Sequence, residues 1–221
     1  MSRRLIMLRH GQTEYNAARR MQGQLDTVLS AAGVEQARTA AQQLKGAGIT
    51  RIVSSDLTRA RHTAEIVAAA LGVDVTEDPR LRETHLGQWQ GLTHEEVDNA
   101  HRGARAHWRN NPSWAPPGGE SRLEVARRAR PVVDELIASY PQWQDNAVLL
   151  VAHGGTISAL TSNLLGFGEG QYPLLKGLEN VATSRVRALP RYTEGGDPDY
   201  DPADPAQVAW YLDAWNQGVS E

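Results

Sequence analysis

Two apolar segments of this chain end in the same way, on a histidine followed by glycine. Residues 5–11 read Leu-Ile-Met-Leu-Arg-His-Gly, and residues 147–155 read Ala-Val-Leu-Leu-Val-Ala-His-Gly-Gly. Short continuous apolar runs of this kind are typical of strands that are buried on both faces of a sheet. In open α/β sheets, ligands bind in the crevice beyond the carboxyl ends of the strands. The pattern therefore predicts that His10 and His153 lie together at such a crevice.

Strand and helix signals alternate along most of the chain, which predicts an α/β fold with a mostly parallel sheet. We expect strands at residues 4–8, 51–55, 73–76, 147–151 and 181–189, the last of them antiparallel at an edge. We expect helices at residues 30–45, 57–71, 93–99 and 156–165, and a long helix that begins at Ser121. Pro131 inside this long helix should either kink it or remove one backbone hydrogen bond.

The regular pattern is lost between about residues 78 and 120. A loop region of this length inside a compact domain is usually functional. We therefore expect a single domain over residues 1–221, with an inserted loop and helical cap at about residues 82–120. The tail is acidic and turn-rich at residues 197–205, and aromatic residues follow it at 210, 211 and 215. We expect this tail to fold back over the pocket.

Composition excludes several classes of protein. The formal net charge of −3 gives no overall positive field for nucleic acid, and there is no apolar run near 18 residues that could cross a membrane. The chain has no cysteine, which excludes disulfides and thiolate metal sites. Because the amino terminus also lacks a signal-peptide core, we expect a cytoplasmic protein. There is no Gly-x-x-x-x-Gly-Lys phosphate loop and no Gly-x-Ser-x-Gly elbow.

The Arg9-His10-Gly11 tripeptide fits an attack on phosphorus. A nucleophilic histidine must be neutral and held in one tautomer by a hydrogen bond to its other nitrogen. Arg9 would supply charge for phosphate oxygens, and Gly11 lets the backbone approach a phosphate closely. The alternative is a histidine that ends a strand and binds a neighbouring carbonyl group. Phosphoryl transfer through a phosphohistidine is our interpretation of the paired histidines.

Three further positions favour the same chemistry. Arg59 falls in the first turn of a helix, where a cation opposes the helix dipole; the alternative is a solvated arginine. Glu83 is the candidate for the group that protonates the leaving oxygen; the alternative is a salt bridge to Arg80 or Arg82. His153, with the amides of Gly154 and Gly155, could bind the transferred phosphoryl group. No histidine at metal-ligand spacing accompanies it, so we expect no metal site.

Taken in order, these segments resemble the histidine phosphatase superfamily, in its phosphoglycerate-mutase-like branch. The segments that carry the resemblance are 8–16, 22–23, 29–30, 54–60, 81–91, 118–121 and 151–154. The resemblance implies a three-layer α/β/α fold. It also implies that His10 is the phosphorylated nucleophile, that Arg9, Arg59 and His153 form the phosphate pocket, and that Glu83 is the proton donor. Neither a metal nor an organic cofactor is required by this chemistry.

Shorter stretches at residues 20–27, 82–87, 114–116 and 212–216 are similar to a group within the family, the actinobacterial phosphatases of glucosyl-3-phosphoglycerate. The substrate contacts expected from the resemblance and from the residues are Gly11, Asn16, Gln22, Gly23, His85, Gly154 and Leu212. A homodimer is expected too, formed through the strand at residues 181–189.

The expected activity is hydrolysis of glucosyl- or mannosyl-3-phosphoglycerate. A broad phosphomonoesterase and a cofactor-dependent phosphoglycerate mutase are the alternatives within the family. The insert before Gly118 is shorter than that of the mutases, which favours hydrolysis. A non-catalytic scaffold on an enzyme fold ranks last, because the histidines, arginines and glutamate are all in place.

Overall fold

The computed structural model describes residues 2–195 and 200–218. Within them, one mixed sheet contains six strands in the order β3-β2-β4-β1-β5-β6. Strand β1 pairs in parallel with β4, β4 with β2, and β2 with β3, whereas β5 is antiparallel to both β1 and β6. The strands are β1 (Arg3–Arg9), β2 (Ile49–Ser54), β3 (Val75–Glu77), β4 (Ala147–Ala152), β5 (Thr183–Pro190) and β6 (Val208–Gln217).

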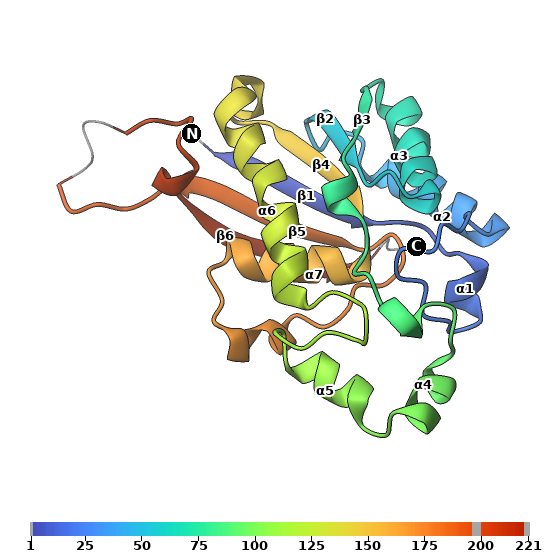
Figure 1. The fold of residues 1–221 in the computed structure, drawn as a ribbon. Coiled ribbons are helices and arrows are strands. Elements are labelled where there is room, and N and C mark those ends of the chain that lie inside the picture. Colours follow the sequence, from blue (N-terminus) through green and yellow to red (C-terminus); the bar gives the residue numbers. More distant parts are fainter. Residues whose placement is uncertain (1, 196–199, 219–221) are drawn as a thin grey trace.

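Helices cover both faces of this sheet, which confirms the predicted three-layer α/β/α architecture (Figure 1). Helices α6 and α7 pack on one face, and α2 and α3 on the other. The α-helices are α1 (Glu14–Ala17), α2 (Ala31–Gln43), α3 (Thr58–Leu71), α4 (His94–Ala100), α5 (Ala104–Asn110), α6 (Arg122–Ser139) and α7 (Gly154–Leu164). Among the described residues, none of these helices has the length and apolar character that crossing a membrane demands.

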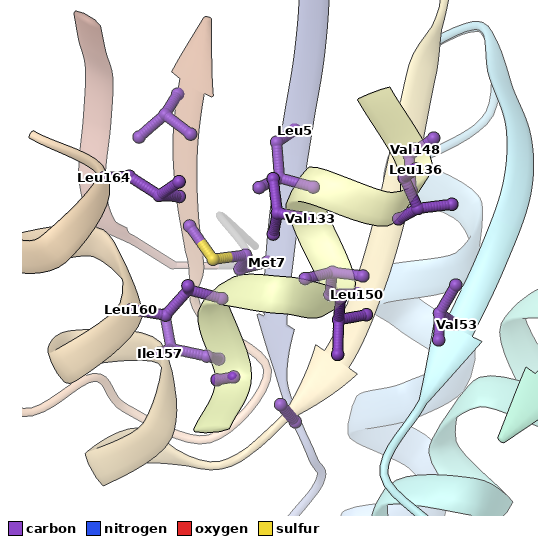
Figure 2. Packing of buried hydrophobic residues seen from close by; sticks show 14 of the residues in the cluster. Leu5, Met7, Val53, Val133, Leu136, Val148, Leu150, Ile157, Leu160 and Leu164 are labelled. Atoms are coloured by element: carbon purple, nitrogen blue, oxygen red, sulfur yellow. The ribbon is translucent and has the colours of Figure 1, made fainter. Parts of the chain in front are cut away.

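Alternation along the central strands explains why their sequences are apolar throughout. On β1, Leu5 and Met7 pack against α6 and α7 (Figure 2), whereas Ile6 and Leu8 belong to the cluster under α2 and α3. Successive side chains of a strand point to opposite faces, so a strand between two helical layers buries all of them. The same alternation holds in β4, with Val148 and Leu150 on one face and Leu149 and Val151 on the other.

The predicted helix starts at Ser30 and Ser121 are confirmed by their capping bonds. The Ser30 hydroxyl accepts a hydrogen bond from Gly33 N, and Ser121 forms a reciprocal capping box with Glu124. These bonds satisfy backbone amides that have no partner within the helix. Helix α6 continues through Pro131 to Ser139.

The segment of residues 82–120 contains α4 and also α5, which the sequence pattern did not predict. Its apolar centre is Trp89, fully buried with Met21, Leu86 and Val97 around it. The segment therefore packs around a cluster of its own. Its assignment as a cap inserted into a single domain stays a prediction.

Two expectations about the carboxyl-terminal part were wrong. The strand at 181–189 exists as β5, but it is not an edge, because β1 pairs with one side of it and β6 with the other. The described part of the tail does not fold back over the pocket but forms β6, whose Val208 and Trp210 are buried in the core. These side chains gain more by covering the sheet than by remaining beside a polar site. In the acidic segment 197–205, residues 197–199 lie outside the described residues.

The loop after β1 lies directly against the start of α2. A Cβ atom on Gly33 would lie 2.0 Å from the carbonyl oxygen of Gln12, and one on Gly11 would lie 2.3 Å from the carbonyl oxygen of Gly33. Both distances are far below van der Waals contact. Glycine at both positions thus allows the backbone that follows His10 to be held by a helix.

We predict that Gly33→Ala destabilises the protein by at least about 1 kcal/mol. Alanine normally stabilises a helix by roughly 1 kcal/mol relative to glycine, but overpacking against backbone costs about 1–3 kcal/mol and here outweighs that gain. Urea unfolding measures the difference. The control is Gly170→Ala, where a Cβ atom has no neighbour within 4 Å. A stabilised Gly33→Ala protein would contradict the close approach.

Candidate active site

His10 ends β1 and is 2% exposed. Its Nδ1 lies 2.7 Å from the carbonyl oxygen of Gly11. Because a carbonyl group can only accept, Nδ1 carries the proton, and Nε2 keeps its lone pair. The backbone N–H of His10 donates to Ala152 O at 3.1 Å, which ties the end of β1 to the end of β4. With the proton on Nδ1 and a lone pair on Nε2, His10 is in the tautomer that nucleophilic attack by Nε2 requires.

His153 follows β4 and is fully buried beside His10, with 5.1 Å between the ring centroids. Its Nε2 lies 2.9 Å from the hydroxyl oxygen of Ser55, which follows β2. Among the described residues, its Nδ1 is buried without a hydrogen-bond partner. The two histidines therefore lie together at the carboxyl ends of neighbouring strands, as the sequence predicted. The unpaired Nδ1 of His153 can therefore form a hydrogen bond with a ligand oxygen.

Burial and nearby cations keep both imidazoles neutral. Burial lowers the pKa of His10 and of His153 well below the usual value near 6.5, and the positive charges of Arg59 and Arg9 lower each pKa further. A neutral His10 at neutral pH is competent as a nucleophile, because its lone pair is free.

Arg59 is one of the most deeply buried side chains, at 1% exposed. The alternative of a solvated arginine is therefore wrong. Its guanidinium donates to the carbonyl oxygens of Gly23 at 2.7 Å and Leu25 at 2.8 Å, and burial lowers its pKa to about 10. Arg9 donates in the same way to the carbonyl oxygen of Leu178. In the described part of the chain, the Nε atoms of both arginines are buried without a partner.

A small cavity of about 150 Å³ opens beside these groups. Four of its lining residues are arginines or a histidine, one is a glutamate, and the rest are uncharged. The lining residues are Arg9, His10, Asn16, Arg20, Gln22, Gly23, Arg59, Glu83, Thr84, Leu86, Trp108 and Gly155. Arg9 and Arg59 outnumber the one carboxylate of the lining, Glu83, which favours an anion, and a phosphate group has the forked geometry that arginine binds. The cavity is thus a candidate phosphate pocket.

Two amide side chains are oriented so that their NH₂ groups remain available to this pocket. The side-chain oxygen of Gln22 accepts hydrogen bonds from the hydroxyls of Thr13 at 2.9 Å and Thr27 at 2.6 Å. The oxygen of Asn16 accepts from the backbone N–H of Thr13 at 3.1 Å and from Asn180 at 3.3 Å. Since each oxygen is occupied by donors, each NH₂ group can donate to a phosphate oxygen.

The Glu83 carboxyl group is held at the amino end of α7. It accepts hydrogen bonds from the backbone N–H groups of Gly155 at 3.1 Å, Thr156 at 3.2 Å and Thr84 at 2.7 Å. The alternative of a salt bridge to Arg80 or Arg82 is wrong. Arg80 pairs with Asp78 and Glu135, and Arg82 pairs with Asp56.

A larger cavity of about 670 Å³ adjoins the phosphate pocket. The two cavities share five lining residues, namely Arg9, Glu83, Thr84, Trp108 and Gly155. Glu83 therefore lies at the junction, within reach of whatever group a phosphate in the small cavity is attached to. A volume of this size lies in the range of small-molecule sites.

Comparison of the sequence with known proteins identifies the family to which the chain belongs. Residues 5–194 match the family described as the histidine phosphatase superfamily, branch 1. The chain belongs to this family.

Individual members are similar over nearly the full length of the histidine phosphatase chain. It is 51% identical over 218 residues to the glucosyl-3-phosphoglycerate phosphatase of Mycolicibacterium vanbaalenii, covering 97% of this chain and 94% of that one. It is 41% identical over 187 residues to a probable phosphoglycerate mutase of Proteus mirabilis, covering 82% and 83%. The solved structure of a mycobacterial glucosyl-3-phosphoglycerate phosphatase with VO₃ superposes with a TM-score of 0.88 at 47% identity, covering 98% and 100%. The chain is a phosphatase enzyme.

Some expected substrate contacts of the phosphatase lie elsewhere in the fold. Gly154 lines the larger cavity, but Gly11, His85 and Leu212 line neither cavity among the described residues. The His85 Nδ1 accepts a hydrogen bond from Gly87 N at 3.2 Å within its own loop, and Leu212 lies on β6 at 39% exposed. Contacts of these three residues with substrate stay predictions.

Sequence reasoning missed several residues of the site. Arg20 and Trp108 line the phosphate pocket, and Ser55 is bonded to His153. Ser55 belongs to the segments that carry the family resemblance, and Arg20 to the stretch 20–27 that is similar to the narrower group, so these signals could have identified them. Trp108 gave no such signal, because it lies in the aperiodic insert. In the described part of the chain, no three His, Asp or Glu side chains converge as a metal site would require.

We predict that the free energy of unfolding of the histidine phosphatase decreases as the pH falls below about 6.5. The folded-state pKa values of His10 and His153 lie well below that value, so only the unfolded chain binds these protons. The loss approaches about 1.4 kcal/mol per pH unit for each histidine until the folded-state pKa is reached. Urea unfolding between pH 7.5 and 5.5 measures the slope.

The control for this prediction is a double variant, His10→Gln with His153→Gln. Its slope over the same pH range should be smaller, with a residual part from His94, whose pKa burial also lowers. A slope equal to that of the unaltered protein would show that other groups cause the pH dependence.

Proposed function

We propose that this phosphatase hydrolyses the phosphate monoester of glucosyl-3-phosphoglycerate, or of the related mannosyl compound, to a glycosylglycerate and phosphate. The observation that carries the proposal is the pair of adjoining cavities. The small one suits the phosphate, and the large one has room for the rest of the ester. The similarity of 51% identity to a phosphatase named for this substrate supports the choice.

In the first step, the Nε2 lone pair of His10 attacks phosphorus while the ester P–O bond breaks. Glu83, at the junction of the cavities, gives a proton to the leaving oxygen. The two buried arginines and the neutral His153 surround the transferred phosphoryl group. Such donors need no rearrangement as charge develops, which is why preorganised sites accelerate reactions.

In the second step, a water molecule attacks the phosphohistidine. Glu83 accepts a proton from this water, the P–N bond breaks, and inorganic phosphate leaves. The water enters through the space that the leaving group has vacated, which Glu83 also lines. One carboxyl group thus acts first as acid and then as base, because it faces the same oxygen position in both steps.

A phosphoglycerate mutase is the second candidate, favoured by the 41% identity to a probable mutase. A mutase must keep water away from the phosphohistidine and return the phosphoryl group to a sugar-acid hydroxyl. The larger cavity extends from Glu83 to exposed residues such as Arg109 and Lys176. This opening favours hydrolysis. A broad phosphomonoesterase is the remaining alternative.

We predict faster phosphate release from glucosyl-3-phosphoglycerate than from 3-phosphoglycerate or an aryl phosphate, with excess chelator present. His10→Ala should lower the rate by more than about 10⁴-fold, because no other group takes over the attack. The matched control, His101→Ala, alters an exposed histidine outside both cavities and should keep full activity.

Each other outcome of this experiment has a clear meaning. Equal, slow release from all three esters would indicate a broad phosphomonoesterase. Conversion of 3-phosphoglycerate to its 2-phospho isomer, followed by ³¹P NMR, would indicate a mutase. Full turnover by His10→Ala would contradict the phosphohistidine itself.

We further infer that the phosphatase forms a homodimer through β6. This ten-residue strand is the outermost of the sheet on its side, and Tyr211 and Leu212 on it are 50% and 39% exposed. An edge strand offers unpaired N–H and C=O groups to a second copy. The proposed contact through β6 replaces the one expected through the strand at residues 181–189, because that strand lies in the interior of the sheet. Besides the substrate and a second copy of the chain, neither nucleic acid nor a membrane is an expected partner, and a cytoplasmic location stays a prediction from the sequence.

We predict that Leu212→Lys shifts the protein from dimer to monomer in sedimentation equilibrium, because it places a charge at the contact. Tyr192→Lys is the control, since Tyr192 is 84% exposed and lies outside β6. A monomeric unaltered protein, or a dimer that Leu212→Lys leaves intact, would contradict this interface.

A further inference from the structure

The larger cavity contains positively charged side chains in addition to those that surround the phosphate pocket. Arg109, Arg122 and Lys176 line it, and Glu83 is its one carboxylate among the described residues. None of these three cations lines the phosphate pocket. A second group of positive charges at the position of the leaving group points to a second anionic group on the substrate.

Arg122 is the least favourably placed of the three for stability alone. It is the first residue of α6, an 18-residue helix, where a cation opposes the positive end of the helix dipole. Burial lowers its pKa, and the nearby charge of Arg109 lowers that pKa further, which outweighs the smaller, opposite effect of the Glu83 carboxylate. In the described part of the chain, no hydrogen bond or ion pair of its guanidinium group offsets these costs. Residues placed against their local preference are often functional.

The Arg122 guanidinium is nevertheless held in one place. Its carbon atom Cζ lies 5.5 Å from the ring centroid of Trp108, within the range of a cation–π interaction. Trp108 lines both cavities, so this contact positions the guanidinium beside the entrance to the phosphate pocket. A guanidinium group with unoccupied N–H donors binds a carboxylate through two parallel hydrogen bonds.

We propose that Arg122 binds a carboxylate of the leaving group, with Arg109 and Lys176 adding to the positive field around it. The enzyme then selects phosphate monoesters that carry a second anionic group a few bonds from the ester. The proposal rests on the proposed function, in which the glycerate carboxylate of the substrate is this group. Arg122 then determines substrate specificity from outside the phosphate pocket.

The test compares two esters that differ only in this group. 3-Phosphoglycerate carries a carboxylate where glycerol 3-phosphate carries a hydroxymethyl group. We expect the unaltered enzyme to have the higher kcat/KM for 3-phosphoglycerate. Arg122→Gln should lower that kcat/KM by about 10–100-fold, as for the loss of a charged hydrogen bond, and the loss for glycerol 3-phosphate should be at least tenfold smaller.

The control variants separate recognition from support of the fold. Arg127→Gln removes an exposed cation of the same helix that lies outside both cavities, and it should change neither ester. Arg122→Lys keeps the charge without the forked donors and should lose an intermediate factor. Equal losses for both esters in Arg122→Gln would show that Arg122 only supports Trp108. No loss for either ester would show that the carboxylate binds elsewhere.

A second measurement does not depend on turnover of the two esters. Each of them is added as a competitor while hydrolysis of an aryl phosphate is followed. The inhibition constant of 3-phosphoglycerate should rise about 10–100-fold in Arg122→Gln, and an unchanged constant overturns the proposal. If glucosyl-3-phosphoglycerate is a poor substrate but this constant rises, the proposed substrate fails while the carboxylate site stands.

Discussion

Parallel pairing of β1 with β4 is the constraint on which the active site depends. The register places Arg9 opposite Ala152, and the N–H of His10 continues the ladder to Ala152 O. The next residue of each strand is therefore a histidine at the same edge of the sheet. Helical layers on both faces fix this register, because a shift by one residue would turn Leu5 and Ile6 toward the wrong clusters. The pairing of the two histidines is thus a consequence of core packing.

Around this pair, positive side chains outnumber the single carboxylate of the pocket, Glu83. The guanidinium groups of the buried Arg59 and the half-buried Arg9 stand beside two neutral imidazoles, and the Nε atoms of both arginines and the Nδ1 of His153 lack partners among the described residues. Unpaired buried donors cost free energy in the substrate-free protein. A phosphate that satisfies them recovers this cost on binding. Donors that are already in position therefore contribute to the affinity of the pocket for an anion.

The sequence predicted the parts of the site that follow regular elements. His10, His153 and Arg59 adjoin strands or a helix whose apolar pattern is plain, and Glu83 was chosen by chemistry. The tail was misplaced because the sequence pattern of a strand does not identify the strand with which it pairs, and β6 pairs with β5. Trp108 and Arg122 were missed as site residues because they lie in or beside the aperiodic insert, where only the folded chain shows which side chains face the cavity.

The arginines of the phosphate pocket are held by main-chain carbonyl groups of Gly23, Leu25 and Leu178. Every amino acid carries such a group, so many side-chain changes in these loops leave the pocket's charges in place. The larger cavity is different, because side chains such as Trp108, Arg109 and Lys176 make its surface. Evolution can therefore alter the leaving group that this scaffold accepts, one side chain at a time, while the chemistry at phosphorus is inherited unchanged.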